Sequence, residues 1–152
     1  MSALSVDGIL GSIRYLVLGT ADADGNPWTS PVFFALLDRE RVCWVSSPQS
    51  RHSRNIAEHP AIAITVFDST VAVGSAEAAY FDATAAALPQ DEVPGALAAL
   101  NARLPAGKEL DTEDLEPAGP LVAYAATLRR RYVLVRGGST ESTHAFDTTV
   151  EI

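Results

Sequence analysis

The chain has 152 residues, 47% of them hydrophobic and 20% charged, with a formal net charge of −8 and a pI near 4.7. This length predicts one domain, residues 1–152, with a hydrophobic core of its own. The acidic balance argues against a nucleic-acid-binding protein, because such proteins present a basic face that displaces counterions from phosphates. It argues equally against binding to an anionic membrane surface.

Cysteine content and the first residues set the expected location. Cys43 is the only cysteine, which excludes an internal disulfide and any site built from several cysteines. We expect Cys43 to be a buried strand residue of a protein in a reducing compartment. The start of the chain has no basic segment followed by a long apolar run, and no run reaches the length of a membrane span. The expectation is a cytoplasmic protein without a signal peptide.

The first part of the chain predicts a short helix at 2–14 and then strands joined by tight turns. Strands are expected at 15–21, 28–37 and 42–46. Asp24-Gly25 supplies the positive φ that a tight hairpin needs between the first two. Pro31 removes a ladder donor, so a bulge or an unpaired position is expected there. These three strands would form an antiparallel meander.

A short helix is predicted from Ser50, acting as its cap, to Pro60, which stops it. The apolar run 61–67 predicts a strand buried on both faces, and 70–81 a long strand bent at Gly74.

From 82 to 120 alanine and leucine replace the β-branched residues, which predicts a helical insert with helices at 92–104 and 111–115. Strand character returns at 121–135 and at 148–152. About six strands with few short helices predict a mainly β or α+β barrel with an antiparallel sheet. A parallel doubly wound fold would need a helix after nearly every strand.

The most informative segment is the junction between strand 42–46 and the following helix. Hydroxyls, Arg51 and His52 gather there, beside the unpaired N–H groups and positive dipole end of a helix. This is the chemistry that holds a phosphate. The same residues would also fit an ordinary solvated helix end. Arg54 points to another side of the helix and is expected to be a surface or interface charge.

The order of motifs resembles the pyridoxamine 5′-phosphate oxidase-like flavoproteins. The motifs are the Asp-Gly turn, a strand with Ser30-Pro31-Val32, a strand ending in Ser46-Ser47, and a helix with Arg51 and Asn55 closed by Pro60. The resemblance covers about Leu16 to Glu77 and, more weakly, 121–135. It implies a six-stranded antiparallel split β-barrel that binds flavin mononucleotide (FMN) at a homodimer interface. Open sheet edges also favour a two-fold partner.

The resemblance carries over a set of cofactor-binding residues. Arg51 matches a phosphate-contacting arginine, and His52 stands where many members have a lysine. A nearby phosphate would favour its protonated form and make affinity pH-sensitive. The remaining matches are Val45 and Ser46 at a strand end, Ser30, Pro31 and Val32 along the flavin ring, and Ser69 or Thr70 offered by the partner subunit.

Three departures bear on activity. Ser30 replaces an arginine and Ala35 a lysine of the true oxidase, and its arginine-rich C-terminal signature is missing. Synthesis of pyridoxal phosphate is therefore not expected.

Three functions remain open. The first is an FMN-dependent oxidoreductase acting on a small organic substrate, with no side chain named as catalytic because the flavin carries the electrons. The second is a deazaflavin-dependent reductase on the same fold. The third is a non-catalytic module that binds flavin, haem or another small ligand.

Other notable residues have simpler interpretations. His59 and His144 stand at no metal-site spacing, so no metal is expected. At least three of four aromatic residues are expected in the core rather than against a flavin: Trp28, Phe33, Phe34 and Trp44. In the run 129–131, strand alternation puts Arg129 and Arg131 on one face and Arg130 on the other.

Overall fold

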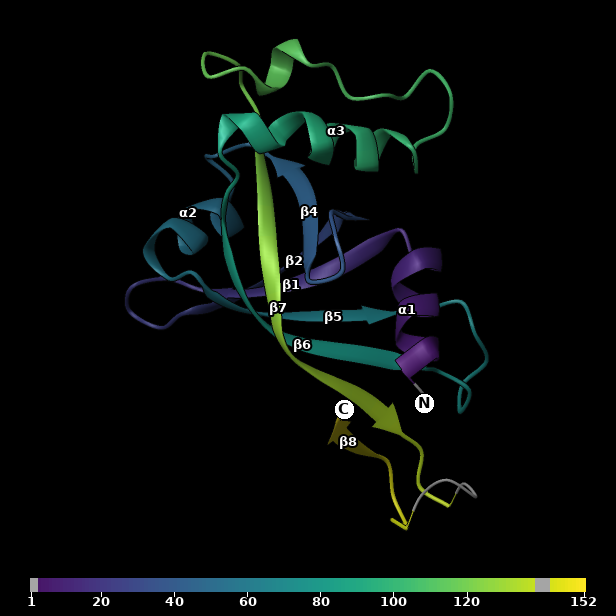
Figure 1. The fold of residues 1–152 in the computed structure, drawn as a ribbon. Coiled ribbons are helices and arrows are strands. Elements are labelled where there is room, and N and C mark those ends of the chain that lie inside the picture. Colours follow the sequence, from purple (N-terminus) through teal and green to yellow (C-terminus); the bar gives the residue numbers. More distant parts are fainter. Residues whose placement is uncertain (1–2, 139–142) are drawn as a thin grey trace.

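The computed structural model describes residues 3–138 and 143–152, which form one curled antiparallel sheet with helices around it (Figure 1). The strands are β1 (Tyr15–Ala21), β2 (Pro27–Phe33), β3 (Ala35–Leu36), β4 (Arg41–Ser46), β5 (Ala61–Phe67), β6 (Ala78–Ala87), β7 (Val122–Val135) and β8 (Thr148–Glu151). The helices are α1 (Ala3–Ser12), α2 (Arg51–Glu58) and α3 (Val93–Asn101), with 3₁₀ turns η1 (Gln90–Glu92) and η2 (Glu113–Leu115). The described sheet thus has eight strands, two more than the six expected.

The order of the strands explains why the sheet closes. The order is β2-β1-β5-β6-β7-β4-β3, with β8 added beside β7. β2 and β3 are therefore at opposite ends of this order, yet Phe34 alone separates them in the chain. Two sheet ends joined by one residue must lie close together, so the sheet has to curl. The predicted mainly β split barrel is confirmed.

The predicted meander holds only in part: β1 pairs with β2, and the end of the predicted strand 28–37, β3, pairs with β4 over Ala35↔Cys43 and Leu36↔Val42. The longer partner of β4 is β7, residue by residue from Arg41↔Thr127 to Ser46↔Val122. Pairing between strands distant in sequence is invisible to local pattern. The predicted strand 28–37 is in fact divided at Phe34. The register of β1 with β2 is unbroken through Val17↔Pro31, and Pro31 is tolerated because β2 is an edge strand.

Two further boundaries differ from expectation. The strand predicted at 70–81 begins only at Ala78, because Asp68 Oδ1 accepts hydrogen bonds from both the backbone N–H (2.8 Å) and the hydroxyl (2.6 Å) of Thr70. This local turn competes with the sheet ladder. The predicted insert 82–120 is likewise shorter at its start, since 82–87 belong to β6. α3 and η2 lie within the predicted helical segments.

The core has two layers. Inside the barrel, buried side chains of the strands meet residues from α1 and from Ile56 of α2. Outside it, α3 and η2 pack on the outer face of β3, β4 and β7, where Cys43 is fully buried. β5 was expected to be buried on both faces, but its burial alternates, and Ala61, Ala63 and Phe67 are exposed.

One arginine ties the outer layer to the barrel. Arg103 follows α3 and donates hydrogen bonds to the backbone carbonyls of Phe34 and Ile13, with its guanidinium 4.8 Å from the Phe34 ring. The insert is thereby attached at the residue that joins the sheet ends. No helix within the described residues is long and apolar enough to cross a membrane.

The position of Phe34 generates a stability prediction. Phe34→Ala should lower the free energy of unfolding by about 3–5 kcal/mol, because the side chain is fully buried at the closure of the barrel. Leu36→Ala, two residues on and 40% exposed, should cost roughly 1 kcal/mol or less. Urea denaturation followed by circular dichroism measures both. Equal losses would contradict the role given to Phe34.

Candidate functional site

The junction between β4 and α2 is built by a capped turn. β4 ends at Ser46, and the chain turns through Ser47 to Ser50 before α2 begins. Ser50 is the cap, as predicted, with extended φ and ψ of −63° and 150° and its hydroxyl accepting a hydrogen bond from the N–H of Ser53. The open first turn of α2 therefore faces the end of β4.

His52 is turned into the protein rather than toward solvent. Its side chain is only 8% exposed, and Nε2 lies 2.8 Å from Ser46 Oγ and 3.2 Å from Ser50 Oγ. Ser50 Oγ is in turn 2.7 Å from Ser53 Oγ. His52 thus holds the hydroxyls of the junction in place.

Burial also favours the neutral form of this imidazole. Because the charged form loses hydration, the pKa of His52 lies below its usual 6.5, so the ring is neutral at neutral pH. Burial therefore opposes the protonated form that a bound phosphate was expected to favour. Arg51 alone brings positive charge to the exposed side of the junction.

Arg51 is positioned by the β1–β2 hairpin. Its guanidinium carbon lies 4.3 Å from the centre of the Trp28 ring, a cation–π contact. One turn later, Asn55 Nδ2 donates to Thr20 Oγ1 at 3.0 Å, and at the end of α2 Glu58 Oε2 accepts from the N–H of Ala23 at 3.1 Å. The helix is fixed to the hairpin along its length, and Arg51 with it.

The aromatic residues divide as expected. Phe34 and Trp44 are fully buried, with Trp44 stacked on Tyr124 at 5.9 Å, and Phe33 packs against the outer layer. Trp28 alone of the four is substantially exposed, at 42%. Its ring is therefore available at the surface beside Arg51.

The other predicted cofactor residues lie in three places. Val45 and Ser46 are half-buried at the end of β4. Ser30, Pro31 and Val32 lie in edge strand β2, where the Val32 side chain is buried in the barrel.

Ser69 and Thr70 are apart from these. They are exposed in the loop after β5, whereas α2 precedes β5, so the whole strand separates them from Arg51 (Figure 1). Seven residues of strand span roughly 23 Å. Within one subunit these residues do not join the others.

Sequence reasoning missed the pocket beside Val45. A cavity of about 300 Å³ lies where the insert meets the sheet, with Val45 and Phe33 in its wall. Its other lining residues are Tyr15, Leu100, Leu104, Lys108, Leu110 and Leu121. The leucine-rich composition of the insert was visible in the sequence, but the strand that it covers was not.

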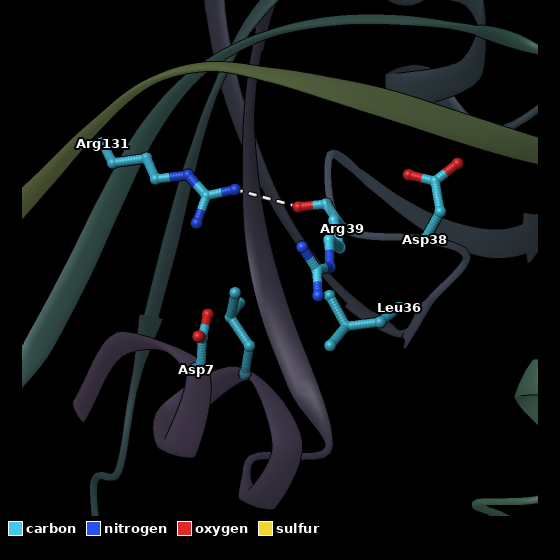
Figure 2. Close-up of a pocket in the computed structure, with 6 residues that line it drawn as sticks. Asp7, Leu36, Asp38, Arg39 and Arg131 are labelled. Atoms are coloured by element: carbon cyan, nitrogen blue, oxygen red, sulfur yellow. Dashed lines mark hydrogen bonds between the residues drawn. The ribbon is translucent and has the colours of Figure 1, made fainter. Parts of the chain in front are cut away.

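A larger pocket of about 690 Å³ lies at the α1 end of the barrel (Figure 2). It is lined by Asp7, Leu10, Leu36, Asp38, Arg39 and Arg131. No local motif connects these residues, because they come from three distant parts of the chain.

Neither a metal site nor a reactive thiol is found among the described residues. In residues 3–138 and 143–152, no three His, Cys, Asp or Glu side chains are grouped so that they could hold a metal ion. Burial raises the pKa of the Cys43 thiol to about 11, which keeps it protonated and unreactive.

Comparison with known proteins settles the family. A family model described as Pyridoxamine 5′-phosphate oxidase matches residues 5–132. The chain belongs to this family. The resemblance drawn from the sequence is confirmed, and the match also spans the insert, which local motifs had left unmatched.

Solved structures agree on the fold. The haem storage protein HutZ from Vibrio cholerae is 22% identical with a TM-score of 0.69, over 84% of this chain and 89% of that one. An FAD-binding protein from Mesorhizobium loti is 19% identical with a TM-score of 0.64, over 86% and 92%. A candidate 5-nitroimidazole antibiotic resistance protein from Bacteroides thetaiotaomicron is 15% identical with a TM-score of 0.70, over 86% and 81%. None of the curated proteins compared matches the chain.

His52 gives a pH prediction. Its pKa is lower in the folded chain than the ordinary 6.5, so between these values the unfolded chain binds more protons. The contribution of His52 to the free energy of unfolding is therefore fully present above pH 6.5 and is lost as the pH falls toward the pKa of His52 in the folded chain. His52→Gln should show a smaller loss of stability between pH 7.5 and 5.5 than the wild type, measured by urea midpoints.

The control is His59→Gln, at an exposed position on the end of the same helix. It should keep the wild-type pH dependence. Identical pH dependence of the wild type and His52→Gln would refute the assignment.

Proposed function

We propose that this chain binds FMN, with the phosphate at the β4–α2 junction, and uses it to oxidise or reduce a small organic molecule. The observation that carries the proposal is the Arg51 guanidinium, held 4.3 Å from the Trp28 ring at the open start of α2. Membership of the pyridoxamine 5′-phosphate oxidase family supports a flavin as the ligand.

The donors at the junction fit a phosphate. Arg51 supplies a charge that is permanent at physiological pH, and the first turn of α2 supplies backbone N–H groups without intrahelical acceptors. With the His52 proton on Nε2, the imidazole donates to Ser46 Oγ, and the Ser46 hydroxyl proton is free to point at the ligand. His52 is then a positioning residue, acting through Ser46.

The edge of β2 fits the flavin ring. An edge strand leaves alternate backbone N–H and C=O groups unpaired, and a flavin ring carries matching donors and acceptors along one side. Ser30, Pro31 and Val32 lie on this edge. The apolar pocket of about 300 Å³ shares Val45 with the proposed flavin site and offers room for a substrate.

A bound flavin supplies the electron or hydride transfer. The side chains of this protein bind the phosphate, orient the ring and keep water from the apolar pocket. No proton-transfer group is needed for that role, and none is assigned.

A homodimer completes the proposed site. Ser69 and Thr70 are too far along β5 to meet Arg51 of the same subunit, so a two-fold partner would bring them there. The chain also exposes Tyr15 (59%), Trp28 and Phe67 (42%), an apolar set that a partner would cover.

Two alternatives share the fold. A deazaflavin could take the place of FMN, and the visible spectrum of freshly purified protein separates the two, since a deazaflavin absorbs at shorter wavelength. A non-catalytic haem or flavin module is favoured by the likeness to the haem storage protein and by the loss of charged groups at Ser30 and Ala35. Flavin binding without turnover of NADH, NADPH or oxygen would support it.

Arg51→Ala should weaken FMN binding by about 1.5–3 kcal/mol, the scale of a charge-assisted hydrogen bond. The loss is about 10- to 150-fold in dissociation constant. Titration of FMN fluorescence measures it. The matched control is Arg54→Ala, which removes an exposed arginine from the same helix and should bind FMN as the wild type does. Unchanged affinity of Arg51→Ala would remove Arg51 from the site.

Light scattering after size exclusion should give twice the chain mass of 16.1 kDa. Phe67→Glu, on the exposed face of β5, should shift the protein toward the monomer and weaken FMN binding. A wild-type monomer that still binds FMN would contradict the shared site.

A further inference from the structure

Strand β7 changes the face that its side chains present. Leu128 pairs with Ala83 and Arg130 with Asp82, so Arg129 is an extra residue, a β-bulge. Before the bulge the even-numbered Leu128 faces the barrel core, and after it the odd-numbered Val133 does. Strand alternation then gives Arg131 the inward side that an unbroken strand would give to Arg130.

The expected arrangement of the three arginines is therefore wrong. Arg129 and Arg130 are both exposed, whereas Arg131 is half-buried and lines the pocket of about 690 Å³ at the α1 end. Bulges are frequent beside functional sites because they re-aim a side chain in this way.

The guanidinium of Arg131 is held by a hydrogen bond to a backbone carbonyl and not by a carboxylate. Its Nη2 donates to the backbone carbonyl of Arg39 at 2.9 Å, as Figure 2 shows, which leaves other N–H groups for the pocket. Arg130, by contrast, pairs with Glu151 at 3.8 Å. Within the described residues Arg131 has no ion pair.

Two more charged side chains without an ion pair among the described residues, Arg39 and Asp7, line the same pocket. Arg39 extends its guanidinium toward Leu36, and Asp7 presents its carboxylate from α1 on the opposite side (Figure 2). Neither side chain has an ion pair in the described part of the chain. Asp38, although it lines the pocket, is bound by Arg41 Nε at 2.8 Å and is neutralised.

The remaining wall is apolar. Leu10 is almost fully buried, and Leu36 is 40% exposed toward the pocket. The volume lies within the range of small-molecule sites, about 300–1,000 Å³. Two free cationic groups, one free carboxylate and an apolar wall complement a molecule with an acidic group, an amino group and an apolar body.

We propose that this pocket is a second small-molecule site that binds an amino-acid-like zwitterion. The acidic group lies between Arg39 and Arg131, the amino group meets Asp7, and the apolar body rests on Leu10 and Leu36. A neutral zwitterion also avoids repulsion by a protein of net charge −8. This site does not depend on flavin binding.

The test uses three probes with the same branched apolar body. Leucine carries both charges, 4-methylpentanoate lacks the amino group, and isopentylamine lacks the carboxylate. Calorimetric titration of the wild type without added flavin should find leucine the tightest. Arg131→Met, which keeps an unbranched stem, should weaken leucine and 4-methylpentanoate about tenfold and leave isopentylamine unchanged. Asp7→Asn should weaken leucine and isopentylamine only.

Controls separate this site from folding and from the flavin. Arg129→Gln, on the same strand but outside the pocket, should bind all three probes as the wild type does. Arg39→Gln at an exposed position should repeat the effect of Arg131→Met without touching the barrel. Arg51→Ala should bind leucine normally even if it loses FMN.

The proposal is overturned if either single-charge probe, 4-methylpentanoate or isopentylamine, binds as tightly as leucine. It is also overturned if Arg131→Met and Arg39→Gln bind leucine as well as Arg129→Gln.

Discussion

One covalent constraint shapes this molecule: the two ends of the sheet are joined through Phe34 alone. The chain breaks its strand at Phe34, and the two-residue strand β3 that follows pairs with β4 in place of β2 (Ala35↔Cys43, Leu36↔Val42). The sheet must instead close through the long route, β1-β5-β6-β7, and return to β4 from the other side. β2 is left as an open edge beside the closure, and the insert with Arg103 covers the outside of it. The accessible edge and the apolar pocket beside Val45 are both consequences of this closure.

At the β4–α2 junction, the neighbouring residues Arg51 and His52 have different roles. Arg51 is exposed, and the Trp28 ring of the hairpin holds its guanidinium in position. His52, one residue later, points inward and orders the serine hydroxyls, and burial lowers its pKa. Neighbours on a helix are about 100° apart, so one can serve the surface while the other serves the interior. A conservative exchange of His52 for lysine would bury an ammonium instead, with a large desolvation cost.

Local chemistry made much of the fold predictable. The Asp24-Gly25 turn, the Ser50 cap and the strand ending at Val135 all rest on neighbours in the sequence, and the structure has them. What local pattern could not supply was partner choice: β4 pairs with a strand about 80 residues away. The bulge at Arg129 is equally hidden, since it exists only relative to β6.

The candidate site divides in the same way. The junction itself was readable from strand, hydroxyls and helix start. The direction of the His52 ring was not, because it depends on Ser46 in the folded chain. The segment after β5 alternates like a strand, yet Asp68 turns it away through a side-chain bond that competes with the ladder. The pocket lined by Asp7, Arg39 and Arg131 could not be predicted from the sequence, because only the folded chain brings these three residues together.

Cys43 has a consequence that extends beyond its packing. It is the only thiol, it is fully buried, and it pairs with Ala35 of β3 at the closure of the barrel. Because α3 and η2 cover its side chain, a sulfhydryl reagent reaches it only when this outer layer lifts from the sheet. The rate of thiol modification in native conditions thus measures local opening of the insert, without any label having to be introduced.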